Sequence, residues 1–532
     1  MRQVTLYDTT LRDGTQGEGI SLSVEDKLKI TKRLDRLGVQ FIEGGWPGSN
    51  PKDMEYFQRL SELTLRQATV VAFSATRRPQ VAVESDKNIH ALINAGVSAV
   101  TIFGKSWDFH VTSALKTTLE ENLAMIRDTI TYVKQQGLRV FYDAEHFFDA
   151  YKANPDYAMT TIRTAQAAGA ETIVLCDTNG GSIPSFIQET VAQVVAEMSV
   201  PIGIHAHNDS ELAVANSLLA IEAGASQVQG TINGYGERCG NANLCSIIPT
   251  LVLKMGIECI SQESLYWLTD LSRYVSELAN LHHNAHQPYV GKSAFAHKGG
   301  IHVSALLKDP TTYEHINPQL VGNQRRVLVS ELSGMSNVLY KAEEMGIDTS
   351  TMNQDTQRIL TEVKHLEHQG FQFEGAEGSF ELMMRKAFNQ KPDFFELENL
   401  RIIYEMREGE LDSEAVIKVR VGDQIVHTAA EGNGPVNAMD NALRKALTNF
   451  YPSLQDMSLS DFKVRVLDEK SGTGALVRVL IETGKGTDTW GTVGVSGNII
   501  EASWQALVDS IVYGLLLEQK TQQPPVEEDD WY

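Results

Sequence analysis

Two histidines separated by one residue, His205 and His207, lie in the segment GIHAHND (203–209). In an extended strand, residues i and i+2 project from the same face, so both imidazoles can present a nitrogen to one divalent ion. Near the N-terminus, Asp13 follows a short apolar alternation in VTLYDTTLRDG and offers a carboxylate oxygen. Two imidazoles and a carboxylate suit a Mg, Mn, Co or Zn ion with coordination positions left open. Taken alone, each half is better explained by surface histidines or by an N-terminal turn, so the metal interpretation depends on the fold.

Short β-branched runs recur along residues 1–255, alternating with stretches of helical period. The pattern predicts eight strands, at 4–8, 39–43, 69–73, 99–103, 138–145, 172–177, 201–207 and 226–232. Eight βα units in about 250 residues are typical of a (β/α)8 TIM barrel. The alternative is a doubly wound open sheet, which would need a G-x-G-x-x-G loop after the first strand, and LRDGTQGEG lacks that spacing.

The active site of a TIM barrel lies at the carboxyl ends of its strands, and polar residues gather at those ends in this sequence. A glycine-rich loop, NGYGERCGN (233–241), follows the eighth strand and offers amide or acid groups to a metal. The two halves of the metal site are therefore expected at one mouth of the barrel. The residues expected there are Arg12, Asp13, Glu43, Glu145, His146, Asp177, Thr178, His205 and His207.

Three motifs, DTTLRDGTQ, HAHND followed by LAVANS, and GYGERCGNANL, make the chain resemble the DRE-TIM metallolyases. Within that superfamily it is similar to the 2-isopropylmalate, homocitrate and citramalate synthases. The similarity continues through SAFAHKGGIH (293–302) to a C-terminal segment that looks like the allosteric domain of these synthases, so it covers nearly the whole chain. The segments 44–53, 144–158 and 368–387 look most like the long-form citramalate synthases.

The resemblance implies a set of ligands for the metal and the substrate. Thr178 matches the residue that binds the carboxylate of the 2-keto acid, and Arg12 also belongs to the substrate site. Glu211 departs from the family pattern, because many relatives carry glycine there, and this puts the local loop shape in doubt. The implied metal ligands are Asp13, His205, His207 and Asn241.

The resemblance also implies a reaction, the condensation of acetyl-CoA with a 2-keto acid, which is pyruvate in the citramalate synthases. A metal-bound keto acid has a polarised carbonyl, and Arg12 adds positive charge where an alkoxide develops. His302 is the expected base toward acetyl-CoA, since an imidazole titrates near working pH. Without the resemblance, His302 would be interpreted as a structural histidine beside a Gly-Gly turn. The catalytic residues implied are Arg12, Glu43, Glu145, His302 and Tyr313.

The keto acid and the reaction class have alternatives. Trp46, Phe73, Phe103 and Tyr142 could narrow the pocket and favour pyruvate over 2-ketoisovalerate, although each methylene discriminates by only about 1 to 3 kcal/mol. These aromatics are equally explicable as barrel layers. A 2-isopropylmalate synthase shares every catalytic motif, whereas an aldolase or lyase of the superfamily usually lacks the linker and the C-terminal domain. A catalytically silent amino-acid sensor would need a broken site.

Three segments are expected after the barrel domain (1–255). Residues 256–390 are mostly of helical pattern and predict linker subdomains, which by resemblance cover the barrel of the partner subunit in a homodimer. Strand patterns return after Pro392 and predict a separate α+β regulatory domain at 391–518. The tail 519–532, QKTQQPPVEEDDWY, is predicted to be disordered.

Two glycine turns in the C-terminal domain precede predicted helices, at 432–435 and 494–497. Helix N-termini suit carboxylates, so an amino-acid effector is chemically sensible, while the alternative is a pair of turns at a dimer interface. The resemblance favours effector binding, and isoleucine is the expected ligand because citramalate leads toward it in a threonine-independent route. The effector-binding candidates are Gly432, Gly434, Gly494 and Ser496.

Composition excludes several classes of function. The chain of 532 residues is 42% hydrophobic and 21% charged, which is ordinary for a globular protein with several cores. Its formal net charge of −22 disfavours binding to nucleic acid or to an anionic membrane. We expect no signal peptide and no apolar run that approaches a membrane span. The four cysteines, at 176, 239, 245 and 259, show no zinc or disulfide spacing, which favours a reduced, cytoplasmic setting.

Overall fold

The computed structural model describes residues 2–330, 333–347, 355–388, 390–407, 410–468, 472, 474–486 and 488–522. The chain forms two compact units. Unit 1 comprises Met1–Phe295 with His315–Arg325, and unit 2 comprises Ala296–Glu314 with Arg326–Tyr532. The predicted linker region is therefore not one body, because part of it packs with the barrel and part belongs to unit 2.

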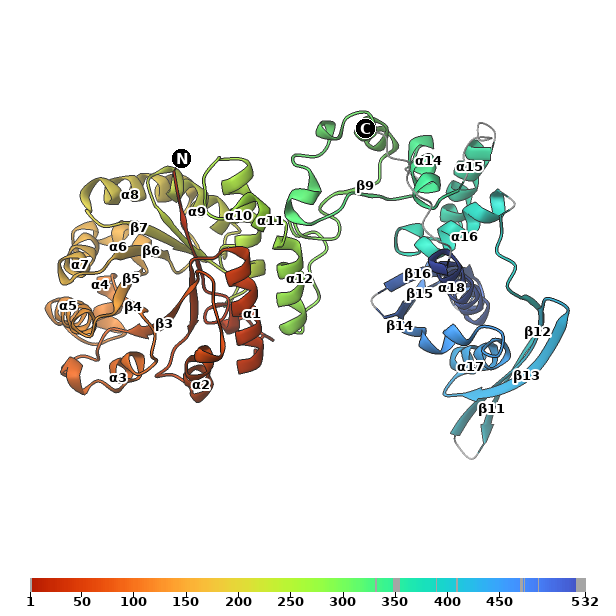
Figure 1. The fold of residues 1–532 in the computed structure, drawn as a ribbon, viewed down its shortest axis with the longest axis horizontal. Helices are drawn as coiled ribbons and strands as arrows, with labels where there is room; N and C mark the ends of the chain where they lie inside the picture. The colour runs from red at the N-terminus through yellow and green to blue at the C-terminus, as the bar shows by residue number, and fades with distance from the viewer. Residues whose placement is uncertain are drawn as a thin grey trace. The chain divides into compact units, whose positions relative to one another are not determined.

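Unit 1 contains the predicted TIM barrel, closed by eight parallel strands in sequence order (Figure 1). The barrel closes because β1 pairs with both β2 and β8. Each strand begins and ends within two residues of its predicted position. The strands are β1 Thr5–Asp8, β2 Phe41–Gly45, β3 Thr69–Ala75, β4 Ala99–Lys105, β5 Arg139–Glu145, β6 Thr172–Asp177, β7 Ile202–Ala206 and β8 Gln227–Gly230.

Helices surround the barrel, and local sequence sets their ends. Ser23 and Asp26 form a capping box at the start of α1, and Gly38, with φ 102°, ends it in the left-handed conformation. Pro155 opens α7, where the missing N–H costs nothing. The helices are α1 Val24–Leu37, α2 Pro51–Arg59, α3 Lys87–Ile93, α4 Asp108–Ser113, α5 Leu119–Gln135, α6 Phe147–Ala153, α7 Pro155–Ala168, α8 Pro184–Glu197, α9 Ala213–Glu222, α10 Leu244–Leu253, α11 Gln262–Leu265 and α12 Leu268–Leu278.

The barrel interior is layered because side chains alternate between its inside and its outside. One inner layer is apolar and contains Tyr7, Phe41 and Phe141, with the last two rings 4.8 Å apart at their centroids. The polar residues of the mouth lie further toward the carboxyl ends of the strands. Tyr142 is fully buried in the separate core between strands and helices. The expectation that Tyr142 narrows the pocket is therefore wrong.

Unit 2 begins with short elements and helices. The two-residue strands β9 Ala296–His297 and β10 Arg326–Val327 pair in parallel. The helices are α13 Gly300–Leu306, α14 Met335–Glu344, α15 Asp355–His368 and α16 Glu377–Ala387. α13 and α14 approach closely at their first turns, since a Cβ at Gly300 would lie only 2.5 Å from the backbone nitrogen of Gly334.

The C-terminal part of unit 2 repeats one βββα arrangement, which agrees with the predicted α+β domain. Each half is a three-stranded antiparallel sheet followed by a helix that packs on it (Figure 1). The two halves share one hydrophobic core, to which Ile417 and Leu443 contribute from the first half and Ile481 and Leu507 from the second. The elements are β11 Glu396–Arg407, β12 Glu410–Val421, β13 Gln424–Gly432, α17 Pro435–Leu447, β14 Ser458–Val466, β15 Val477–Lys485, β16 Asp488–Ser496 and α18 Ile499–Gln522.

A further core joins the linker helices to the second sheet. Val338 of α14, Val363 of α15 and Phe380 of α16 pack in one cluster with Val493 and Val495 of β16. The helices α14 to α16 are therefore part of the folded body that contains the second βββα half.

The last helix differs from the sequence expectation in two respects. α18 continues to Gln522, so residues 519–522 of the predicted disordered tail are helical, and 523–532 lie outside the described residues. Among the described residues, its stretch Ile499–Thr521 is long and apolar enough to cross a membrane, contrary to the expectation that no run approaches a span. More than half of that window, 56%, is buried inside the protein, because α18 packs on β15 and β16 as a core helix.

Candidate active site

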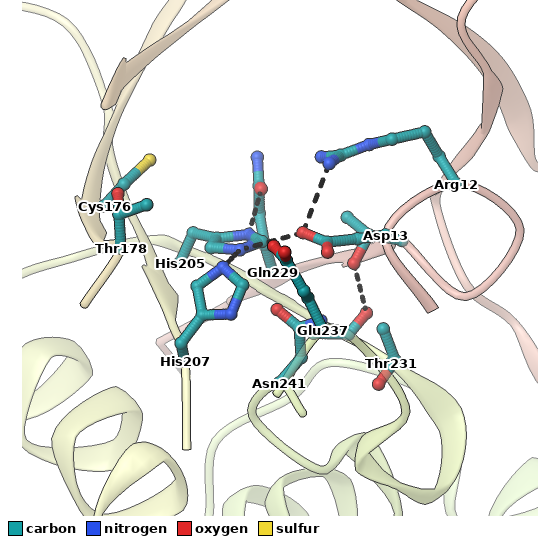
Figure 2. Close-up of polar contacts among 12 residues, drawn as sticks. Arg12, Asp13, Cys176, Thr178, His205, His207, Gln229, Thr231, Glu237 and Asn241 are labelled. Carbon is teal, nitrogen blue, oxygen red and sulfur yellow. Dashed lines mark hydrogen bonds and ion pairs between the residues drawn. The ribbon is translucent and has the colours of Figure 1, made fainter. Parts of the chain in front are cut away.

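Asp13, His205 and His207 meet at the carboxyl-end mouth of the barrel (Figure 2). Each offers one ligand atom, and these atoms all lie within 4.8 Å of one another. His205 Nε2 lies 3.3 Å from Asp13 Oδ2 and 3.4 Å from His207 Nε2. All three residues are buried. The fold thus brings together the two halves that the sequence placed at opposite ends of the barrel domain.

Buried polar atoms around this cluster lack partners, which is the pattern expected where an ion belongs. In the described part of the chain, Asp13 Oδ1, His207 Nδ1 and Asn241 Oδ1 are buried without a hydrogen bond. A backbone bridge joins His207 to Asn241, and Asn241 Nδ2 donates to the Tyr235 carbonyl at 3.0 Å, which commits the nitrogen and leaves the oxygen. An unsatisfied buried polar atom costs about 1–3 kcal/mol. These oxygen and nitrogen donors fit a divalent ion.

The glycine-rich loop after β8 is shaped to hold Asn241. Gly236 has φ 153°, and a Cβ there would lie 2.2 Å from Asn241 Nδ2. Glu211, the departure from the family pattern, has φ 59° and adopts the left-handed conformation that favours glycine. Glu211 therefore takes a backbone conformation that a glycine would adopt without strain, and the candidate ligands still meet.

The electrostatics of Asp13 and His207 favour their metal-binding protonation states. Burial alone would raise the pKa of Asp13, but Arg12 at 3.2 Å and the contact with His205 hold it well below its usual range. Burial and the neighbouring His205 lower the pKa of His207 to about 4. Asp13 is therefore ionised and His207 neutral at pH 7, the forms in which both bind a cation.

Arg12 is fixed from three directions. Its Nε donates to Glu43 Oε1 at 2.6 Å, and its guanidinium carbon lies 3.9 Å from the centroid of the Phe73 ring. Glu43 Oε2 accepts from the Tyr7 hydroxyl at 2.8 Å, and that hydroxyl lies 2.6 Å from Thr101 Oγ1. This inner chain of hydrogen bonds holds the Arg12 charge beside Asp13 without a mobile partner.

Thr178 and Glu145 flank a strained turn between β5 and α6. The backbone nitrogen of His146 donates to Thr178 Oγ1 at 2.8 Å, while Glu145 forms an ion pair with Lys105. His146 has φ 55°, and its ring contacts Asp149 at 3.0 Å. A non-glycine residue in this conformation costs of order 1–3 kcal/mol and is common at functional sites. Figure 2 shows Thr178 beside Cys176, on the β6 side of the cluster.

Three aromatic rings form a wall next to Arg12. Phe73 and Phe103 stack with centroids 5.1 Å apart. Trp46 meets both edge-on, at 5.8 Å from Phe73 and 5.6 Å from Phe103. These three of the four aromatic residues expected to limit the pocket therefore lie together.

His302 and Tyr313 belong to unit 2, whereas Asp13, His205 and His207 belong to unit 1. His302 lies in α13, and its ring stacks on Tyr313 with centroids 4.2 Å apart. Both side chains are exposed, Tyr313 by 45%. The pair is accessible to a ligand or to another chain.

The two glycine turns precede α17 and α18 as expected. Gly434 is the N-cap of α17, and Gly432 lines a cavity of about 520 Å³ together with Asn433, Asn437 and acidic residues of β11 to β13. At the second turn, Ser496 Oγ donates to Glu501 Oε2 at 2.6 Å. A Cβ at Gly494 would lie 2.0 Å from the Ala502 carbonyl oxygen, so close packing requires that glycine.

Sequence reasoning missed two polar residues inside the barrel. Gln229 Oε1 lies 2.9 Å from His205 Nδ1, and Gln229 Nε2 donates to Asp143 Oδ1 at 3.2 Å. Burial and the charge of Glu43 raise the pKa of Asp143 to about 7. The available signal was the alternation of β5 and β8, which puts polar side chains at inward positions two residues before Glu145 and Thr231.

Three family models match successive parts of the chain. The HMGL-like model matches residues 3–275, which include all eight barrel strands. The homocitrate synthase post-HMGL domain-like model matches 289–370, and the LeuA allosteric (dimerisation) domain model matches 374–515. The same three modules therefore occur in the order that the sequence motifs predicted.

Relatives align over nearly the full length. The chain is 58% identical to a protein of Geobacter sulfurreducens named (R)-citramalate synthase, over 97% of this chain and 98% of that protein. It is 57% identical to a protein of the same name from Synechocystis, over 96% of both chains. It is 33% identical to a 2-isopropylmalate synthase of Methanocaldococcus jannaschii, over 96% of this chain and 94% of that protein. These alignments span the barrel, the linker and both C-terminal repeats.

Proposed function

Because the chain belongs to the (R)-citramalate synthase family, we propose that it condenses acetyl-CoA with pyruvate and releases (R)-citramalate and CoA. The observation that carries this proposal is the 58% identity over 97% of the chain. The 33% identity to a 2-isopropylmalate synthase is much lower, so that alternative has weaker support. The product fits a threonine-independent route to isoleucine.

Asp13, His205, His207 and Asn241 are the proposed ligands of a divalent ion, on the grounds of their unpartnered buried atoms. When bound, such an ion supplies a Lewis acid that polarises the carbonyl of a 2-keto acid. Thr178, on the neighbouring strand end, is proposed to bind the carboxylate of pyruvate.

Arg12 is proposed to stabilise the alkoxide that forms from the keto oxygen. Its ion pair with Glu43 and its contact with Phe73 fix the guanidinium before the reaction, so no reorganisation accompanies the development of charge. Glu43 acts by holding Arg12. A fixed charge in a buried site is worth more than the same charge in water.

The base toward acetyl-CoA is proposed to be His302. It removes a proton from the methyl group, the resulting carbanion equivalent attacks the keto carbon of pyruvate, and water then cleaves the thioester to release CoA. Tyr313 stacks on His302 and restricts its ring. Glu145, paired with Lys105, is proposed to assist the proton transfer. The LeuA dimerisation domain supports a homodimer, in which the histidine of one subunit serves the barrel of its partner.

Isoleucine is the proposed effector, bound at the turns with Gly432, Gly434, Gly494 and Ser496. The cavity beside Gly432 supports an amino-acid ligand, because its acidic lining suits an ammonium group and the first turn of α17 suits a carboxylate. A cytoplasmic location is also proposed, in keeping with four free cysteines.

A keto-acid panel tests the function. CoA release is measured with acetyl-CoA and either pyruvate or 2-ketoisovalerate, and the chiral product is identified by chromatography. We expect kcat/KM for pyruvate to exceed that for 2-ketoisovalerate by at least about tenfold, as excluded volume in a small pocket permits. A preference for 2-ketoisovalerate would replace this proposal with 2-isopropylmalate synthase.

A further inference from the structure

A buried chain of hydrogen bonds runs across the barrel interior behind His205. Gln229 on β8 is fully buried, and Asp143 on β5 is 4% exposed. Gln229 Oε1 lies 2.9 Å from His205 Nδ1, and Gln229 Nε2 lies 3.2 Å from Asp143 Oδ1. In Figure 2 the amide of Gln229 reaches the side of the His205 ring that faces away from Asp13.

The amide of Gln229 determines which groups donate and which accept along this series of hydrogen bonds. Gln229 Nε2 donates to Asp143 Oδ1, and that oxygen accepts whether or not the other oxygen of Asp143 carries a proton. The amide oxygen is then left facing His205 and can only accept. A neutral His205 must therefore carry its proton on Nδ1, which leaves the lone pair of Nε2 directed toward Asp13 and His207.

We propose that Gln229 is a positioning residue that fixes the Nδ1-protonated tautomer and the ring orientation of His205 for metal binding, with Asp143 holding its amide. The inference rests on the proposed metal site and adds residues that no ligand assignment includes. Groups that hydrogen bond to a metal-binding histidine commonly change metal affinity by about 10–100-fold. Gln229 does not touch the ion in this arrangement and acts only through His205.

The same strand provides a matched control. Gln227 lies two residues before Gln229 on β8, points into the same barrel and is 3% exposed. Its Oε1 has no hydrogen-bond partner among the described residues. Methionine has nearly the shape of glutamine without its amide, so Gln227→Met and Gln229→Met remove the same group from neighbouring inward positions.

The test measures metal binding directly. Metal-stripped, full-length Gln229→Met, Gln227→Met and parent proteins are titrated with Mn²⁺ by calorimetry, and their Tm values are measured without metal. We expect Gln229→Met to bind Mn²⁺ about 10–100-fold more weakly at a nearly unchanged metal-free Tm, with kcat largely recovered at saturating Mn²⁺. We expect Gln227→Met to bind like the parent. Equal Mn²⁺ affinity in all three proteins would overturn the role of Gln229.

A pair of variants that exchanges the amide of Gln229 and the carboxyl of Asp143 keeps the test decisive if Gln229→Met fails to fold. Gln229→Glu alone places a second buried carboxylate next to Asp143. Adding Asp143→Asn supplies an amide that can donate a hydrogen bond to the new glutamate. We expect the double variant to recover Mn²⁺ affinity to within about tenfold of the parent. A double variant that binds Mn²⁺ no more tightly than Gln229→Glu alone would count against the proposal. His207→Ala separates the premises: if it binds Mn²⁺ as tightly as the parent, the metal site itself is wrong.

Discussion

The guanidinium carbon of Arg12 lies 3.9 Å from the centroid of the Phe73 ring, so the proposed catalytic charge and the aromatic wall beside it are one packed unit. A cation over an aromatic ring is worth about 2 kcal/mol when both are desolvated. Phe73 is 7% exposed and stacks on Phe103, which extends the wall away from the charge. Substitutions at the two phenylalanines are therefore expected to have different consequences.

Enlarging the pocket at Phe103 is expected to relax the choice of keto acid. Phe103→Val removes ring volume from the wall without removing the ring under Arg12, so kcat/KM for 2-ketoisovalerate relative to pyruvate should rise about tenfold or more. Phe73→Val is the comparison, because it also removes support from Arg12 and should lower kcat for both substrates. Steady-state kinetics with the two keto acids measure both effects. A selectivity unchanged by Phe103→Val would place the wall outside the pocket.

Removing the metal is expected to abolish turnover while the fold remains. Exhaustive chelation should lower activity by at least about a hundredfold, and re-addition of Mn²⁺ should restore it, because the carbonyl of the keto acid is then polarised again. Circular dichroism before and after chelation checks the fold. Full activity in protein shown by elemental analysis to be metal-free would contradict the role of Asp13, His205 and His207.

Mixed dimers test whether His302 acts at the barrel of the partner subunit. His302→Ala and Asp13→Ala damage different units of the chain, so each homodimer should be nearly inactive. Subunit exchange should return up to about a quarter of the parent activity, because a mixed dimer then has one intact pair. Differently tagged subunits, purified in tandem, give the mixed dimer for assay. Inactivity of that purified mixed dimer would show that both residues act within one subunit.

The sequence predicted the barrel because local signals repeat in it. The strands are short apolar or β-branched runs, and several helices have a cap or a glycine stop that needs no knowledge of the fold, as at Ser23 and Gly38 of α1. The proposed metal ligands were recognised because His205 and His207 are two residues apart in a predicted strand. Gln229 was missed because its partner Asp143 is 86 residues away, and only barrel closure brings these two inward positions together.

Other errors have equally physical causes. Tyr142 was assigned to the mouth from its nearness to a strand end, but its neighbours Phe141 and Asp143 take the inward positions and Tyr142 must face outward. Helical period does not reveal which body a helix packs on, so no local signal indicated that part of 256–390 belongs to unit 1. The core that joins α14 to α16 with Val493 and Val495 is a long-range packing fact without a local signal.

Asp509 is expected to make unit 2 less stable as pH rises. It accepts a hydrogen bond from Ser379 at 2.6 Å, and burial raises its pKa to about 6. Between about pH 4 and 6 the folded state keeps a proton that the unfolded state has lost, so stability falls through this window and stays low above it. The difference of about two pKa units corresponds to at most about 3 kcal/mol.

Asp509→Asn keeps an acceptor for Ser379 and removes the charge, so it should stabilise the protein at pH 8 by up to about 3 kcal/mol and flatten the pH dependence. Urea unfolding followed by tryptophan fluorescence at pH 5 and pH 8 measures this. Asp488→Asn, exposed at the start of β16, is the control and should change stability by less than about 0.5 kcal/mol. If the two substitutions change stability equally, Asp509 does not have a pKa raised by burial.

Inhibition by isoleucine is expected to depend on the turn before α17. Removing the chain after about residue 392 is a poor test, because it would strip Val493 and Val495 from the core that holds Phe380 and α14. Gly434 is better placed, since its φ of 178° is open to any residue and no atom lies within 4 Å of a Cβ there. Gly434→Leu can therefore put a bulky side chain at the N-terminus of α17, two residues after the cavity-lining Gly432, without unfolding the helix.

We expect Gly434→Leu to raise the isoleucine concentration for half inhibition at least about fivefold while uninhibited kcat stays within about twofold, since allosteric coupling of 1–3 kcal/mol is lost. Gly497→Leu is the matched variant at the second turn, where a Cβ also meets nothing within 4 Å. If both turns form the effector site, both variants should weaken isoleucine binding measured by calorimetry. Inhibition that competes with pyruvate and is unchanged in both variants would place isoleucine in the barrel, and the C-terminal repeats would then serve assembly alone.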